Sequence, residues 1–336
     1  MSPEPRTVAA FTERELIDRI VRRLPPPPSW MLVGIGDDAA VVEPERNRVE
    51  VLTVDALVEG IHFDRAFTPP QAIGHRALAA NLSDLAAMGA APRLALLSMA
   101  LPPALPIDDF DGIAGGIAAL ASQHRLHVAG GNLTGSPGPL VIDITVVGTV
   151  KRRQALRRAG ARAGDEICVS GTVGAAAAGL QMLKQKLATT GDTVESCIQR
   201  YLCPEPRVRM GMLLSRNGAA TACMDLSDGL ADAVRQVAEA SGVGAIVEAD
   251  ALPIDADARG WFEARGKDAV TEAISGGDDY ELLVAVRPKT RRRLAALSGS
   301  PGAPLTRIGV FTEDRTVILR RPAGDAPLPA GYAHFR

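Results

Sequence analysis

The spacing of apolar residues predicts that helices and strands alternate along the chain. In the first helical segment the apolar residues recur three or four positions apart: Leu16, Ile17, Ile20, Val21 and Leu24. Thr12 and Glu15 form the pattern of a helix-capping box, and the four prolines at 25–28 cannot continue a helix. We therefore expect an opening helix between residues 12 and 24.

Strands are indicated elsewhere by short apolar or alternating runs bounded by glycine and proline, and helices by a 3.6-residue period. In the first half we expect strands at 49–58, 93–101, 126–131 and 140–150 and helices at 71–89 and 109–125. In the second half we expect strands at 166–171, 221–226, 281–286 and 305–311, a helix between Pro204 and Gly218, and a helix at 231–242.

A change of composition marks a domain boundary near residue 150. The strand expected at 140–150 is followed by the basic stretch KRRQALRRAGARAGDE, after which strands and helices begin again. We expect an N-terminal domain over 1–150 and a C-terminal domain over 151–336. Both mix helices with strands, so the predicted fold class is α+β with two domains.

Composition narrows the classes of function. The chain has 336 residues, of which 46% are hydrophobic and 23% charged, as in soluble globular proteins. Its formal charge of -2 gives no general attraction for nucleic acid or an anionic membrane. No leader-like or membrane-spanning segment is visible, so we expect a cytoplasmic protein. The cysteines lack C-x-x-C spacing and are expected to be reduced structural thiols: Cys168, Cys197, Cys203 and Cys223.

Aspartates recur beside glycine turns and at expected strand ends. Asp38 follows the turn in GIGDDAAVV and Asp55 is expected to close the strand ending VLTVD. Further acids lie in NLSDLAAMG, DLSDGL and SGGDDYELL: Asp84, Asp225, Asp228, Asp278 and Asp279. Each segment alone is typical of an ordinary turn or N-cap. Their recurrence with few interleaved Lys or Arg favours compensation by divalent cations, and magnesium bound to carboxylates and phosphate oxygens fits best.

A dinucleotide fingerprint is the main competing interpretation of the first glycine turn. Gly34, Gly36 and Ala39 match G-x-G-x-x-A, and Asp55 lies near the distance expected of a ribose-binding acid. That fingerprint requires a helix to start within the turn. Here a strand-like run broken by Pro44 follows, so we reject this interpretation. A P-loop motif is also absent from the sequence.

Six ordered segments carry a resemblance to a known family: GIGDDAAVV, TVDALVEGIHF, ALAANLSDLAAMGAAP, GGNLTG, DLSDGL and SGGDDYELL. Together they resemble thiamine-monophosphate kinases, which belong to a superfamily with aminoimidazole ribonucleotide synthetase and selenophosphate synthetase. The resemblance implies an aminoimidazole ribonucleotide synthetase-like fold. It also implies an N-terminal domain that binds ATP and magnesium and pairs its sheet across a homodimer, and a C-terminal domain that completes the nucleotide and substrate site.

The implied reaction is magnesium-assisted transfer of the γ-phosphoryl group of ATP to thiamine monophosphate, which gives thiamine diphosphate. The implied magnesium ligands are Asp38, Thr53, Asp55, Asp84, Asp225 and Asp228, of which Asp55, Asp225 and Asp228 are the implied catalytic residues. The implied nucleotide contacts are Gly131, Asn132, Arg158 and Ser227. The implied thiamine-monophosphate contacts are His62, Asp278 and Tyr332.

Two positions depart from the family pattern and leave alternatives open. Asn132 stands where an aspartate ligand is usual, and Val54 stands where Ser or Thr is common. Asn132 could instead cap a turn after Gly130 and Gly131. The alternatives are another ATP-dependent enzyme of the superfamily, or a nucleotide-binding homologue with weakened catalysis that acts as a sensor. A reactive N-terminal cysteine, expected of selenophosphate synthetase, is not seen, since the first cysteine is Cys168.

Overall fold

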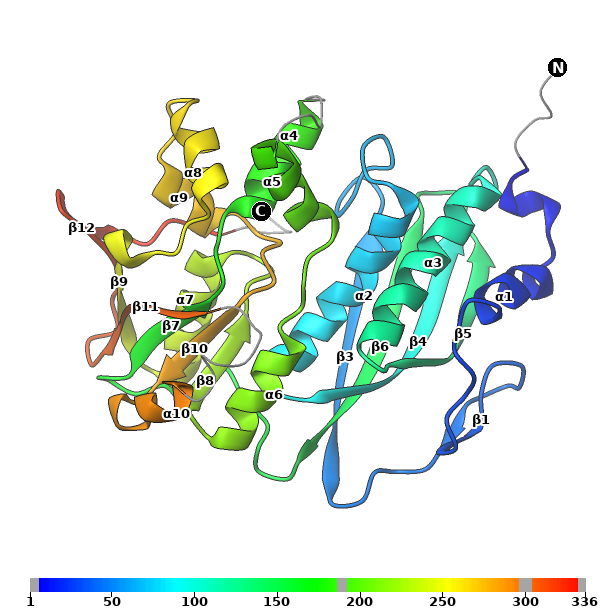
Figure 1. Cartoon of the computed structure of the whole chain (residues 1–336), viewed down its shortest axis with the longest axis horizontal. Helices are drawn as coiled ribbons and strands as arrows, with labels where there is room; N and C mark the ends of the chain where they lie inside the picture. Colours follow the sequence, from blue (N-terminus) through cyan, green and yellow to red (C-terminus); the bar gives the residue numbers. More distant parts are fainter. Residues whose placement is uncertain (1–5, 186–191, 296–303, 332–336) are drawn as a thin grey trace. The chain divides into compact units, whose positions relative to one another are not determined.

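The chain divides into two compact units, which we describe separately. The structure is a computed structural model that describes residues 6–185, 192–295 and 304–331. The first unit contains residues 1–82 and 92–150, and the second contains residues 83–91 and 151–336. Each unit mixes helices with strands (Figure 1). The predicted assignment of separate functions to two domains stays a prediction.

The first unit has most of the elements that its apolar pattern predicts. They are η1 Val8–Ala10, α1 Glu13–Val21, β1 Met31–Val33, β2 Val41–Val42, β3 Arg48–Val58, α2 Pro70–Ala87, β4 Ala91–Leu101, α3 Ile107–Gln123, β5 His127–Gly135 and β6 Val141–Lys151. The capping box at α1 is confirmed. The Thr12 N–H donates to Glu15 Oε2 at 2.8 Å, and the Glu15 N–H donates to Thr12 Oγ1 at 3.3 Å.

A four-stranded sheet in the order β3-β6-β4-β5 is the centre of the first unit. Helices α2 and α3 cover one of its faces (Figure 1). Along β4, Leu97, Met99 and Leu101 are buried, whereas the alternate residue Leu96 is 40% exposed. On β3, Leu52 and Val54 are 66% and 59% exposed. Because side chains alternate along a strand, the face without helices is partly apolar and open to solvent.

The second unit is built on a seven-stranded sheet in the order β13-β12-β9-β11-β7-β10-β8. Its strands are β7 Glu166–Ser170, β8 Ala220–Asp225, β9 Gly244–Glu248, β10 Leu282–Val286, β11 Leu305–Thr312, β12 Val317–Arg321 and β13 Gly324–Pro327. Its helices are α4 Ala175–Lys184, α5 Asp192–Leu202, α6 Val208–Asn217, α7 Leu230–Ser241, η2 Ala249–Ala251, α8 Ala256–Glu263, α9 Ala269–Ser275, η3 Pro288–Thr290 and α10 Arg291–Ala295. The paired strands are antiparallel except that β12 runs parallel to β9.

Two hydrophobic clusters fill the second unit. The larger one joins β7, β8, β9 and β10 to α7, with Val169, Val234 and Leu283 fully buried. A smaller cluster around Trp261 and Phe262 joins α4, α5 and α8. Among the described residues, no helix is both long enough and apolar enough to cross a membrane.

The segment 83–91 belongs to the second unit because the end of α2 packs closely on α6. A methyl group at Gly211 of α6 would overlap the carbonyl oxygen of Ala86, so only glycine allows this approach. The Leu156 N–H also donates to the Met88 carbonyl oxygen at 3.1 Å. The approach places the last turns of α2, with Ser83 and Asp84, in the same unit as β8.

We predict opposite effects of two glycine-to-alanine substitutions in helices of the second unit. Gly211→Ala should lower the free energy of unfolding by about 1–3 kcal/mol, because the added methyl group overlaps backbone. Gly260→Ala in α8 should raise it by up to about 1 kcal/mol, because nothing lies within 4 Å of the new methyl group. Urea unfolding followed by circular dichroism measures both, and equal effects would contradict the close packing of α6 on Ala86.

Candidate active site

A buried carboxylate pair lies where β8 meets the last turns of α2. Asp225 is the last residue of β8 and is 4% exposed. The buried Ser83 hydroxyl donates to Asp225 Oδ2 at 2.8 Å. Burial, followed by the charge of nearby Asp84, raises the pKa of Asp225, and the Ser83 hydrogen bond opposes this rise. The protein thus holds two carboxylates near each other, and the charge of Asp225 is compensated only in part.

The donor set at this pair fits a hard divalent cation. Carboxylate and hydroxyl oxygens are the protein ligands that magnesium prefers, and a cation would favour the ionised form of Asp225. Within the described ranges, no three or more His, Cys, Asp or Glu side chains are grouped so as to hold a metal ion. The pair by itself supplies two carboxylates and a hydroxyl, and this donor chemistry fits magnesium.

Two loops beside the pair bring three predicted site residues together in the second unit. The Asp278 N–H donates to the Ser227 carbonyl oxygen at 2.8 Å, and the Tyr280 N–H donates to the Leu226 carbonyl oxygen at 3.0 Å. A side chain at Gly277 would overlap the Ser227 carbonyl oxygen, so this approach needs glycine. Ser227 and its neighbour Asp228 are thereby fixed against the loop that carries Asp278.

Arg158 lies near the same carboxylates. Its side chain is exposed, and its Nη1 donates to Gln236 Oε1 at 2.6 Å. Its positive charge lowers the pKa of Asp225, although less than burial and Asp84 raise it. The second unit thus brings together Asp84, Asp225 and Arg158, as well as the paired loops of Ser227, Asp228 and Asp278.

Three predicted residues of the first unit, Thr53, Asp55 and His62, lie on β3 and in the turn after it. Thr53 and Asp55 are two residues apart in β3 and share a face of the strand. The expectation that Asp55 closes its strand is wrong, because β3 continues to Val58. His62 lies in the following turn, where its Nδ1 accepts the Val58 N–H at 3.0 Å. This bond makes Nδ1 the acceptor and leaves Nε2 as the protonated nitrogen of the neutral ring.

The glycine turn at 34–38 continues into strand β2, and no helix starts there, which confirms the rejection of a dinucleotide site. Asp37 and Asp38 are both exposed, and the Asp38 N–H donates to Asp37 Oδ1 at 2.8 Å. Exposure to solvent lowers the cost of holding these two charges next to each other.

Asn132 lies in a strand. Gly131 and Asn132 are part of β5 and pair with Leu97 and Ser98 of the parallel strand β4. The alternative that Asn132 caps a turn is therefore wrong, since the backbone is extended from His127 to Gly135. Asn132 is exposed. Tyr332, a predicted substrate contact, lies outside the described residues.

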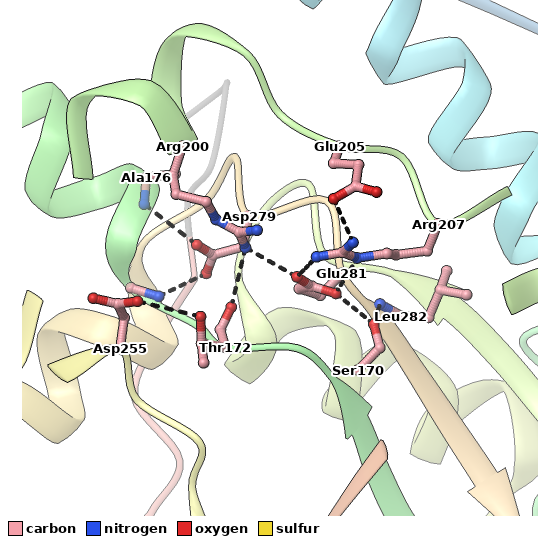
Figure 2. A network of polar contacts seen from close by, with 11 residues as sticks. Ser170, Thr172, Ala176, Arg200, Glu205, Arg207, Asp255, Asp279, Glu281 and Leu282 are labelled. Carbon is pink, nitrogen blue, oxygen red and sulfur yellow. Dashed lines mark hydrogen bonds and ion pairs between the residues drawn. The ribbon is translucent and has the colours of Figure 1, made fainter. Parts of the chain in front are cut away.

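Several residues that the sequence did not single out complete the surroundings of the site. Ser83 fixes Asp225, and a buried network beneath the Asp278 loop contains Glu281 with its donors Arg200 and Arg207, next to Asp279, which the sequence did single out (Figure 2). The sequence signal for Ser83 was its place next to Asp84 in NLSDLAAMG. Glu281 had no comparable signal, because its arginine partners are more than 70 residues away in the chain.

The fold and these loops define a two-domain protein of the AIR synthase related type. The family model "AIR synthase related protein, N-terminal domain" matches residues 36–150, and "AIR synthase related protein, C-terminal domain" matches residues 162–321. The thiamine-monophosphate kinase of Bacillus subtilis is 34% identical over 313 residues, which cover 90% of this chain and 94% of that protein.

Two solved structures support the same assignment. The thiamine-monophosphate kinase of Stenotrophomonas maltophilia is 41% identical with a TM-score of 0.83, and the match covers 92% of this chain and 96% of that one. AaThiL complexed with AMPPCP and TMP is 32% identical with a TM-score of 0.77, with coverage of 96% and 97%. This chain belongs to the thiamine-monophosphate kinase family, and the fold class implied by its motifs is confirmed.

We predict that Asp279 makes stability depend on pH. Burial raises its pKa from 3.8 to about 7, although N–H groups of Gly174 and Ala176 oppose the rise. The folded state thus binds the proton more tightly than the unfolded state, so this stabilisation is complete below about pH 4 and is lost as the pH rises through 7. Between pH 4.5 and 7.5 the stability of the parent relative to Asp279→Asn should fall by roughly 3 kcal/mol.

Urea unfolding of the parent and of Asp279→Asn over this pH range measures the effect. Groups that titrate alike in both proteins cancel in the difference. A difference in unfolding free energy that stays constant with pH would show that Asp279 is ionised in the folded state throughout.

Proposed function

We propose that this chain transfers the γ-phosphoryl group of ATP to the phosphate of thiamine monophosphate, which gives thiamine diphosphate. The observation that carries the proposal is the likeness to AaThiL complexed with AMPPCP and TMP, which extends over 96% of this chain at 32% identity. The carboxylate pair and the paired loops of the second unit support it, because they gather acids and backbone groups suited to a metal–phosphate site.

Magnesium is the metal that the donor set fits. Asp84 and Asp225 would hold it, and Asp228, Asp38, Thr53 and Asp55 are the further proposed ligands. When bound, magnesium neutralises phosphate charge and orients the phosphoryl groups for in-line transfer. Ser83 restricts the orientation of the Asp225 carboxylate through its hydrogen bond, so that one oxygen is already engaged before any ligand binds.

The remaining residues bind and orient the two substrates in this proposal. Arg158 contacts the nucleotide phosphates with its exposed guanidinium group, assisted by Gly131, Asn132 and Ser227. His62 donates from Nε2 to the phosphate of thiamine monophosphate, since Val58 occupies Nδ1. Asp278 and Tyr332 are the other proposed contacts with this substrate. Transfer between two anions depends on such positioning and charge neutralisation more than on covalent participation by the protein.

A homodimer is the proposed state of assembly. The open face of the first unit's sheet exposes Leu52, Val54 and Leu96, a group of large apolar side chains that marks an interaction surface. A second copy of the same sheet is the occupant implied by the family resemblance. A cytoplasmic location stays a prediction from the sequence.

The first test of this function is thiamine-monophosphate-dependent formation of ADP in the presence of magnesium. ATP consumption that does not depend on thiamine monophosphate would contradict the proposal. Binding of MgATP without any turnover would favour the sensor alternative, for which the neutral Asn132 is the supporting feature.

We predict that Ser83→Ala raises the magnesium concentration needed for half-maximal activity by about tenfold, because a side chain that hydrogen-bonds a metal ligand typically contributes about 10- to 100-fold to metal affinity. Loss of the hydroxyl frees the Asp225 carboxylate to rotate and strengthens proton competition for it. Ser215→Ala is the matched control, since it also removes a buried serine hydroxyl with a 2.8 Å bond, in this case to the Gln154 carbonyl oxygen. Overlapping magnesium titrations for all three proteins would contradict the role of Ser83.

We predict that Leu52→Glu converts the dimer to a monomer at micromolar concentration. A charge on the open sheet face would have to be desolvated if two such faces pack together. Val21→Glu on α1 is the control, because Val21 is 41% exposed and α1 packs on the helix layer through the Arg19–Asp111 ion pair. Light scattering after size exclusion gives the mass, and a Leu52→Glu protein that stays dimeric would exclude this face.

A further inference from the structure

The loop that carries Asp278 has an unfavourable backbone conformation. Asp278 and Tyr280 have φ angles of 68° and 50°, in the left-handed region that non-glycine residues rarely adopt. Such a backbone conformation is unfavourable for a residue with a side chain and persists only where its surroundings enforce it. Contacts within the second unit must therefore keep residues 276–281, which we call the DDYE loop, in this conformation.

Asp279 is one anchor of the DDYE loop. Its side chain is 3% exposed and lies between the two left-handed residues. Its Oδ2 accepts the Gly174 N–H at 2.9 Å and its Oδ1 accepts the Ala176 N–H at 3.5 Å. These donors belong to the N-terminus of α4, so Asp279 connects the loop to the N-terminal end of that helix (Figure 2).

Glu281 is the second anchor and is fully buried. Arg207 donates to both of its oxygens, from Nε to Oε2 at 2.7 Å and from Nη2 to Oε1 at 2.5 Å. Arg200 donates from Nη2 to Oε1 at 2.9 Å, and the Ser170 hydroxyl donates to Oε2 at 2.5 Å. Figure 2 shows these side chains converging on Glu281 from α5, from the segment before α6 and from the end of β7.

The backbone of the DDYE loop also pairs with the loop that follows β8. The backbone of Asp278 and Tyr280 is bonded to Ser227 and Leu226, and the Leu226 N–H donates back to the Glu281 carbonyl oxygen at 2.9 Å. Asp278 thus lies between a backbone pairing and two buried side-chain anchors. Release of either anchor would allow the left-handed residues to relax and Asp278 to move.

We propose that Asp279 and Glu281 are positioning residues that fix Asp278 for binding of thiamine monophosphate. This inference rests on the proposed function and deepens it, because it assigns the positioning of the proposed substrate contact Asp278 to a buried network. The network is suited to this role because a buried ion pair contributes little net stability but restricts geometry strongly when each oxygen has directed donors. Arg207 donates two hydrogen bonds to Glu281, and together they fix the orientation of the Glu281 carboxylate.

The test compares Glu281→Gln and Asp279→Asn with the matched control Glu205→Gln. Glu205 also pairs with Arg207, at 2.8 Å, but is 66% exposed and has no bond to the DDYE loop. Steady-state kinetics at pH 8 should show KM for thiamine monophosphate raised by at least about fivefold in both loop variants, with KM for MgATP changed by less than about twofold. The control should match the parent in both constants.

A purely structural network gives a different result. It would lower the thermal midpoint and the amount of folded enzyme, while the folded fraction kept the parent's KM for thiamine monophosphate, and this outcome would overturn the inference. Arg207→Lys keeps the positive charge but loses the two-pronged geometry, so it should reproduce the KM increase if Glu281→Gln does not fold.

Failure of Glu281→Gln, Asp279→Asn and Arg207→Lys alike to give folded protein would also overturn the inference, since the network would then be needed by the fold itself. A parent protein without thiamine-monophosphate-dependent ADP formation would refute the proposed function. A parent with that activity and loop variants with unchanged KM would refute only the positioning role.

Discussion

The incomplete compensation of Asp225 is the interaction on which the rest of the second unit's site depends. A carboxylate that is 4% exposed and next to Asp84 is costly to ionise, and the Ser83 hydroxyl, a backbone hydrogen bond and the charge of Arg158 offset that cost only in part, since the pKa of Asp225 stays raised. Glu281 has the same depth of burial but receives donors from two arginines and a serine. The same unit therefore holds one buried acid with two arginine donors and one buried acid whose pKa stays raised.

Close packing between main chains fixes the position of Asp225. The approach of α6 to Ala86 needs Gly211, and the approach of the DDYE loop to Ser227 needs Gly277. In both cases the contact is between main chains, so the separation of the acids on either side is set by covalent geometry and hydrogen bonds. Side-chain rotamers then have little freedom to change it.

The sequence predicted the long elements well and the short or unpatterned ones poorly. Strands β3 and β6 and helix α3 were expected within a few residues of their ends, because their apolar patterns are continuous. Helix α4 begins AAAAG and has no polar–apolar period to detect, and α8 and α9 have only eight and seven residues, shorter than a periodic window. The partners of the buried acids were also beyond reach, because Ser83 and Asp225 are 142 residues apart in the chain.

The sequence motifs nevertheless contained the acid of each of these long-range contacts. Adjacent acids in SGGDDYELL have different environments: Asp279 is buried beneath α4, whereas the Asp278 backbone faces Ser227. Asp278 has a left-handed backbone, whereas Asp279 is not among the residues with positive φ, so the two neighbouring acids are held differently. Sequence spacing cannot reveal this, since Asp tolerates the left-handed region without requiring it. The different environments of these two neighbouring acids are therefore a property of the backbone, imposed by the elements packed around the loop.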